Sequence, residues 1–193
     1  MKAIDIHVHV PDPPGHPAAK EKEDMAEYFG IKDLPKTPEE LYEKYKSLDI
    51  FAVIFSIDAE TNTGVPYIGN DYVAEVAHKY SDQFMGFASV DPWKGKAAVQ
   101  ELRRAVNDLG LRGLKLHPTT QAFFPNDPQF YPLWEAAADL DIPVLFHSGQ
   151  TGVGAREPGG GGFKLKYCQP IPYFDDVAAD FPTLTVIMAH PAV

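Results

Sequence analysis

The stretch "HVHVPDPPG" at residues 7–15 decides the fold, because it directly follows the first strand-like run of the chain. Residues 3–10 (AIDIHVHV) alternate and are rich in β-branched side chains, which predicts a strand. An open dinucleotide-binding sheet would place a glycine-rich phosphate turn after this strand. Residues 7–15 contain no such turn, so the sequence favours a (β/α)8 barrel over an open doubly wound sheet.

Strands and helices alternate along the rest of the chain. We expect apolar strands at residues 3–10, 51–58, 84–91, 111–118, 143–149 and 184–193. We expect amphipathic helices at residues 37–50, 70–83, 96–110, 127–142 and near 172–181, and partial helix within 18–29. Apolar strands separated by amphipathic helices are typical of a buried parallel sheet. The prediction is one α/β domain over residues 1–193, a (β/α)8 barrel of which six strands are present, with residues 11–36 as a lid-like insertion.

Composition and charge narrow the class of function. The 193 residues carry a net charge of −10, which argues against nucleic acid and anionic membranes as partners. Cys168 is the single cysteine, so no intrachain disulfide forms and a cytoplasmic protein is expected. The chain shows no signal peptide, and no apolar run approaches the roughly 18–20 residues of a membrane span.

Histidines gather at the predicted strand ends. Residues i and i+2 of a strand point to the same side, so His7 and His9 share a face, with Ile6 and Val8 on the other. Three more histidines lie at or near the ends of later strands: His117, His147 and His190. Because the strand ends of a barrel surround one axis, these side chains should converge. Three protein ligands with one open position form a catalytic zinc site, for which His7, His9 and His147 are the candidates.

The motifs "DIHVH", "GLKLHP", "VLFHSG" and "IMAHP" together resemble the amidohydrolase superfamily. Within it the chain is similar to the branch typified by aminocarboxymuconate-semialdehyde decarboxylase. That family is a (β/α)8 barrel with His-x-His on strand one, histidines on strands five and six, and an aspartate on strand eight. The resemblance implies that His7, His9 and His147 bind the metal and that His190 is the catalytic acid/base.

The resemblance also implies a cofactor and further pocket residues. Zn²⁺ is the expected metal, with Mn²⁺ as the alternative, and members often form homodimers. Superfamily members with two metals use a carboxylated lysine on strand four, where Lys115 lies, but this branch generally has one metal. Lys115 and His117 are therefore expected to line the substrate pocket. The sequence ends after strand six, so the strand-eight aspartate has no counterpart, and we expect an open barrel edge and an incomplete metal shell.

Three functions remain open at this point. In the leading one, hydrolysis of a small organic substrate, a metal-activated water attacks a carbonyl carbon and His190 moves the proton. The alternative is non-oxidative decarboxylation of an aromatic or unsaturated carboxylic acid. The third is an inactive fragment of such an enzyme. The glycine-rich loop 149–170 is either a mobile connection or a lid over the substrate, and as a lid it would place Arg156 or Lys164 against a substrate carboxylate.

Overall fold

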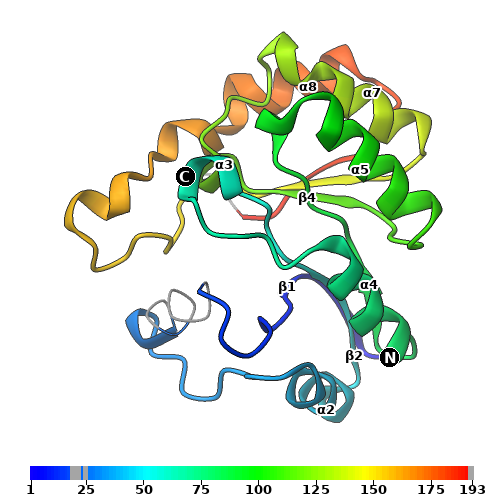
Figure 1. Ribbon diagram of the computed structural model, residues 1–193, viewed down its shortest axis with the longest axis vertical. Coiled ribbons are helices and arrows are strands. Elements are labelled where there is room, and N and C mark those ends of the chain that lie inside the picture. Colours follow the sequence, from blue (N-terminus) through cyan, green and yellow to red (C-terminus); the bar gives the residue numbers. More distant parts are fainter. Residues whose placement is uncertain (18–22, 24–25, 191–193) are drawn as a thin grey trace.

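Six parallel strands follow one another in chain order in the computed structural model, which describes residues 1–17, 23 and 26–190 (Figure 1). The strands are β1 (Ala3–His9), β2 (Ile50–Phe55), β3 (Phe84–Gly86), β4 (Leu114–Leu116), β5 (Val144–Phe146) and β6 (Val186–Met188). They pair as two three-stranded sheets, β1-β2-β3 and β4-β5-β6. A parallel bridge between Ala88 and Leu114 joins the two sheets.

Helices occupy the connections between the strands. They are α2 (Pro38–Leu48), α3 (Glu60–Thr63), α4 (Asn70–Lys79), α5 (Lys96–Asn107), α6 (Pro118–Gln121), α7 (Tyr131–Asp139) and α8 (Asp175–Asp180). Short 3-10 turns lie at η1 (Pro92–Lys94), η2 (Pro128–Phe130), η3 (Pro158–Gly162) and η4 (Leu165–Cys168), and one π-helical turn at η5 (Pro170–Phe174). Parallel strands in chain order with helices between them are the arrangement of a (β/α)8 barrel, so the predicted fold class is confirmed.

The first and the last strand each pair with a single neighbour among the described residues. Within the described residues, β1 pairs only with β2 and β6 pairs only with β5. This agrees with the expected open barrel edge. The division into one domain with an inserted lid at residues 11–36 stays a prediction, and the partial helix expected within 18–29 falls largely outside the described residues.

Two apolar layers hold the strands in place. On β2, Ala52 and Ile54 belong to the large cluster that includes buried residues of the helices, whereas Val53 and Phe55 belong to a smaller one with Phe87 and Leu145. Because both faces of the strand are buried, the sequence there shows a continuous apolar run. The smaller cluster lies on the side of the histidines, because the ring centroid of Phe55 is 5.3 Å from that of His7 and 5.0 Å from that of His9.

Helix starts agree well with the sequence, and strand lengths agree less well. The side chain of Thr37 accepts a hydrogen bond from the Glu40 backbone N–H at 3.2 Å and caps α2, as its position predicts. The strands expected at 84–91 and 111–118 are longer than β3 and β4. Their outer residues leave the hydrogen-bonded ladder but remain largely buried, because the connections at the strand ends pack inside the molecule.

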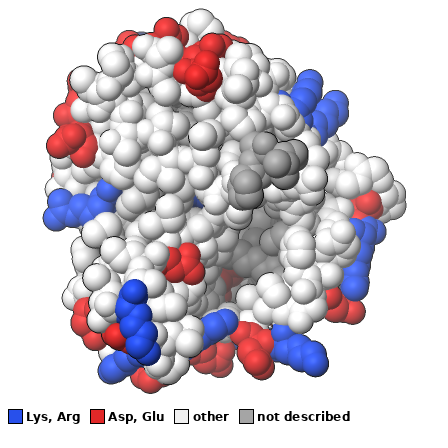
Figure 2. All heavy atoms as spheres, turned by 180° about the vertical axis from the view of Figure 1, so that it is seen from behind, with Lys and Arg blue, Asp and Glu red and all other residues white. Residues whose placement is uncertain are grey.

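One face of the molecule carries few charged side chains at its centre. On the face opposite to that of Figure 1, acidic and basic side chains lie mainly around the rim, and the centre is largely uncharged and hollowed (Figure 2). Among the described residues, the helices are all too short or too polar to cross a membrane.

Candidate active site

Four histidines converge where β1, β5 and β6 end. The ring centroid of His7 lies 5.6 Å from that of His9, 6.2 Å from His147 and 4.7 Å from His190. His147 and His190 are also 4.7 Å apart. The structure thus brings together the four residues that the sequence selected, although His7 and His190 are 183 positions apart in the chain.

A bulge in β1 aims His7 at this centre. Asp5 pairs with Ala52 and Val8 pairs with Ile54, so two residues of β1, Ile6 and His7, lie opposite one residue of β2. Asp5 accepts a hydrogen bond from Tyr45 of α2 at 2.8 Å, and its other oxygen accepts one from the His7 backbone N–H at 3.0 Å. The expected alternation therefore holds for His7, Val8 and His9 but is interrupted at Ile6, because the bulge adds one residue.

His147 is held in one orientation. Its Nε2 donates a hydrogen bond to the backbone carbonyl of Gln150 at 2.9 Å, and its ring stacks on that of His117 at 3.8 Å. Since Nε2 carries the proton, Nδ1 keeps its lone pair for a metal ion. Burial lowers the pKa of His147 to about 3, with a further contribution from the charge of Lys115, so the ring is neutral at pH 7.

The histidine centre suits a divalent metal ion. Ligand atoms of His7, His147 and His190 all lie within 4.8 Å of one another. Burial lowers the pKa of His7 to about 2 and also lowers that of His190, which leaves both neutral, the form that binds metals. The Nδ1 atom of His7 is buried and, among the described residues, has no hydrogen-bond partner. His9, predicted as the third ligand, lies beside His7 at the edge of this group.

The side chain of Ser148 holds the backbone of His190 in place. Ser148 was not among the candidate residues from the sequence. Its hydroxyl donates to the carbonyl of His190 at 2.7 Å and accepts from its N–H at 3.3 Å. Ser148 is fully buried. The signal in the sequence was a serine directly after a strand-end histidine, in "HSG".

Gln121 is a second residue that the sequence analysis missed. Its carboxamide accepts from the His117 backbone N–H at 2.9 Å and donates to the carbonyls of Asp58 at 2.7 Å and Val90 at 2.9 Å. One buried side chain thus joins the segments that follow β2, β3 and β4. The signal was a glutamine four residues after a strand-end histidine, in "HPTTQ".

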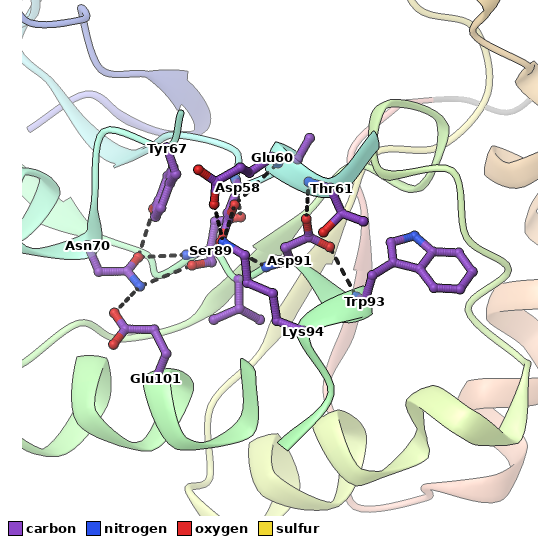
Figure 3. Close-up of polar contacts among 12 residues, drawn as sticks. Asp58, Glu60, Thr61, Tyr67, Asn70, Ser89, Asp91, Trp93, Lys94 and Glu101 are labelled. Carbon is purple, nitrogen blue, oxygen red and sulfur yellow. Dashed lines mark hydrogen bonds and ion pairs between the residues drawn. The ribbon is translucent and has the colours of Figure 1, made fainter. Parts of the chain in front are cut away.

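A further polar network stabilises the same end of the sheet (Figure 3). The carboxylate of Asp58 accepts hydrogen bonds from Lys94 Nζ at 3.0 Å and from the Asp91 backbone N–H at 3.1 Å. Burial raises the pKa of Asp58, although the bond from Lys94 opposes this. Asn70 connects to the next loop, because its amide donates to the Ser89 carbonyl at 3.0 Å. The network holds the loop after β2, which lines a cavity.

A cavity of about 340 Å³ opens beside the histidine centre. His9 and His117 lie in its wall on the sheet side. Most of the other lining side chains are apolar and come from two segments: Val10, Pro11, Ala26, Phe29, Ile31, Leu34 and Pro35, and Ile57, Ala59, Val65, Pro66 and Ile68. The cavity therefore suits an apolar or aromatic molecule with a polar group near the imidazoles.

The predicted substrate residues lie at three different places. His117 lines the cavity, accepts from the Thr120 N–H at 3.3 Å, and has a pKa held well below its ordinary value by burial. Lys115 lies deeper and is fully buried. Arg156 forms an ion pair with Glu27 at 2.9 Å, which joins the two expected lid segments.

The chain belongs to the amidohydrolase family, whose family model matches residues 4–193. Members of this family use a divalent metal ion. The matched residues include all four histidines of the site.

Individual relatives match with low identity. Gamma-resorcylate decarboxylase from Rhizobium radiobacter is 34% identical over 84 residues, which are 40% of this chain and 26% of that protein. The 2-amino-3-carboxymuconate-6-semialdehyde decarboxylase from Dictyostelium discoideum is 30% identical over 78 residues, 40% of this chain and 22% of that protein. A crystal structure of dihydroxybenzoic acid decarboxylase from Polaromonas, with bound manganese, has a TM-score of 0.57 at 19% identity and covers 96% of this chain and 64% of that chain. The chain thus spans less than two thirds of these relatives.

Proposed function

We propose that this protein is a metal-dependent decarboxylase that removes CO2 from an aromatic or unsaturated carboxylic acid without oxidation. The observation that supports this most is four imidazoles beside a cavity with mostly apolar walls. Such walls suit a ring or an alkene, and the imidazoles suit a metal ion and a proton carrier. The decarboxylases matched above favour this reaction over the hydrolysis expected first.

His7 and His147 would hold the metal ion together with one of the two neighbouring imidazoles. When bound, the divalent ion supplies positive charge that binds and stabilises anionic oxygens of the substrate. The family pattern makes His9 the third ligand and His190 the acid/base. The ligand-atom distances favour the reverse assignment, in which His190 is a ligand and His9, which lines the cavity, carries the proton.

The proton carrier acts on the carbon that bears the carboxylate. A histidine suits this step because its ordinary pKa lies near 6.5. After the proton is added, the bond to the carboxylate carbon breaks, its electron pair returns to the ring or alkene, and CO2 leaves. The apolar walls keep water from the reacting carbon and favour the release of a neutral product.

The test uses the purified chain, stripped of metal with a chelator and reloaded with Zn²⁺ or Mn²⁺. We expect metal-dependent CO2 release from 2,6-dihydroxybenzoate, the ligand of a structural relative, or from an unsaturated dicarboxylic acid. A parallel panel of esters and lactones should stay intact. Turnover of esters instead of acids would contradict the proposal, and one bound metal without turnover of either panel would favour an inactive chain.

Histidine variants separate the roles. The variant His147→Ala should lose both the metal and CO2 release, whereas His78→Ala, at an exposed position of α4, should keep both. Of His9→Ala and His190→Ala, the variant that removes a ligand should lose the metal. The variant that removes the proton carrier should keep the metal, measured by elemental analysis, and lose only CO2 release.

A further inference from the structure

Lys115 lies inside the sheet, in the middle of β4. It pairs in register with Leu145 of β5, which belongs to the smaller apolar cluster on the side of the histidines. Its side chain is fully buried. The sheet therefore directs a long cationic side chain to the same side as the strand-end histidines.

The amine of Lys115 has no hydrogen-bond partner among the described residues. The amine lies over the ring of Phe55, whose centroid is 5.2 Å from Nζ, and it also interacts electrostatically with the Cys168 thiol. A buried ammonium normally pairs with a carboxylate or donates several hydrogen bonds, because an unpaired one is strongly destabilising. Burial lowers the pKa of Lys115 to about 7, and the Cys168 thiol opposes this shift.

Lys115 and the histidine centre share one electrostatic environment. The charge of Lys115 lowers the pKa of His7, His147 and His190, so its amine lies within interaction range of all three. Two acids near the same sheets are engaged elsewhere. Asp5 accepts from Tyr45 on the helix side. Asp58 pairs with Lys94.

We propose that Lys115 binds the carboxylate of the substrate at the inner end of the site and selects acids over neutral analogues. The proposal rests on the proposed decarboxylase function, for which the substrate must be an acid. An ammonium donates up to three hydrogen bonds, and a carboxylate accepts them at two oxygens. Binding the acid would satisfy the amine, which explains why a side chain that is costly to bury stands at this position.

Binding of benzoate and benzamide to the zinc-loaded chain tests this, because the two probes share a ring and differ in charge. In Lys115→Met, which keeps most of the length of the side chain and removes its charge, the Kd of benzoate should rise about tenfold or more, the usual loss for a hydrogen bond to a charged group. The Kd of benzamide should not change. Lys96→Met, at an exposed position of α5, should bind both probes as the wild type does.

Thermal unfolding adds a second measurement, since a buried unpaired charge is removed. The melting temperature of Lys115→Met should equal or exceed that of the wild type. Equal benzoate affinity in the variant and the wild type would overturn the proposal, and so would an equal loss of both probes.

If the variant fails to fold, the wild-type protein still provides an answer. The Lys115 ¹³Cε resonance should shift when benzoate is added and stay in place with benzamide, and no shift with benzoate would refute the role. These measurements need no turnover, so a chain that binds benzoate through Lys115 and releases no CO2 would contradict only the decarboxylase proposal.

Discussion

Replacing Gln121 with leucine should remove the hydrogen bonds that join the segments following β2, β3 and β4 beside the site. In the wild type one carboxamide satisfies the His117 N–H and the carbonyls of Asp58 and Val90. Leucine has a similar volume but no polar atom. The variant therefore leaves three backbone groups without this partner in a region that excludes water, and Gln121 itself is fully buried.

The size of the effect follows from these three bonds. Each hydrogen bond contributes about 1 kcal/mol net, and a stranded buried group costs about 1–3 kcal/mol. We therefore expect the free energy of unfolding to fall by about 4 kcal/mol. For a chain of this size, that loss corresponds to a fall in melting temperature of roughly 12 °C. This is a large fraction of the roughly 5–15 kcal/mol that stabilises a typical domain.

Urea unfolding followed by circular dichroism measures the difference directly. The matched control is Gln129→Leu, since Gln129 is exposed and, within the part of the chain that the structure describes, its side chain bonds to Asp127 of its own turn. The control should change the free energy of unfolding by less than about 0.5 kcal/mol. A loss below about 1 kcal/mol in Gln121→Leu would refute the argument that this side chain joins the three segments.

Three further results are expected. Thr37→Ala should lower the free energy of unfolding by about 1 kcal/mol in urea titrations, because it removes the N-cap of α2, and an unchanged midpoint would contradict this. In the metal-free chain, acidification below pH 6.5 should destabilise the fold, since the unfolded chain binds a proton at His117 that the folded chain does not. His117 contributes up to about 1.4 kcal/mol per pH unit to this slope, beside the contributions of His7 and His147, and His117→Asn, which keeps an acceptor for the Thr120 N–H, should reduce the slope by that amount. A β-carbon at Gly152 would overlap the ring of Phe29, so Gly152→Ala should weaken ligand binding in the cavity. The second change Phe29→Leu should restore part of that affinity, and additive losses would contradict the contact.

The fold class and the convergence of the histidines could be predicted because both depend on local patterns. The alternation of apolar strands and amphipathic helices fixes a parallel sheet, and the ends of such strands meet at one edge. The N-cap at Thr37 is also a local signal, and the structure confirms it. These features need no knowledge of distant contacts.

Other features depend on contacts that no local pattern contains. The bulge at Ile6 and His7 is held by Asp5 with Tyr45, which lies 40 positions further along the chain. The ion pair of Arg156 with Glu27 likewise joins segments far apart in the sequence, so its guanidinium is engaged before any substrate arrives. The roles of the individual site residues remain predictions.

The wall of the cavity and the histidine centre come from different parts of the chain. Residues 11–36 contribute Phe29, Ile31 and Leu34 to the cavity, yet within their described part they contribute no strand and none of the three clustered metal-ligand candidates. For directed evolution, acceptance of new acids and the bond-breaking step are therefore separate targets. A mutant library confined to these three positions should change which molecules enter while the metal content of the protein stays the same.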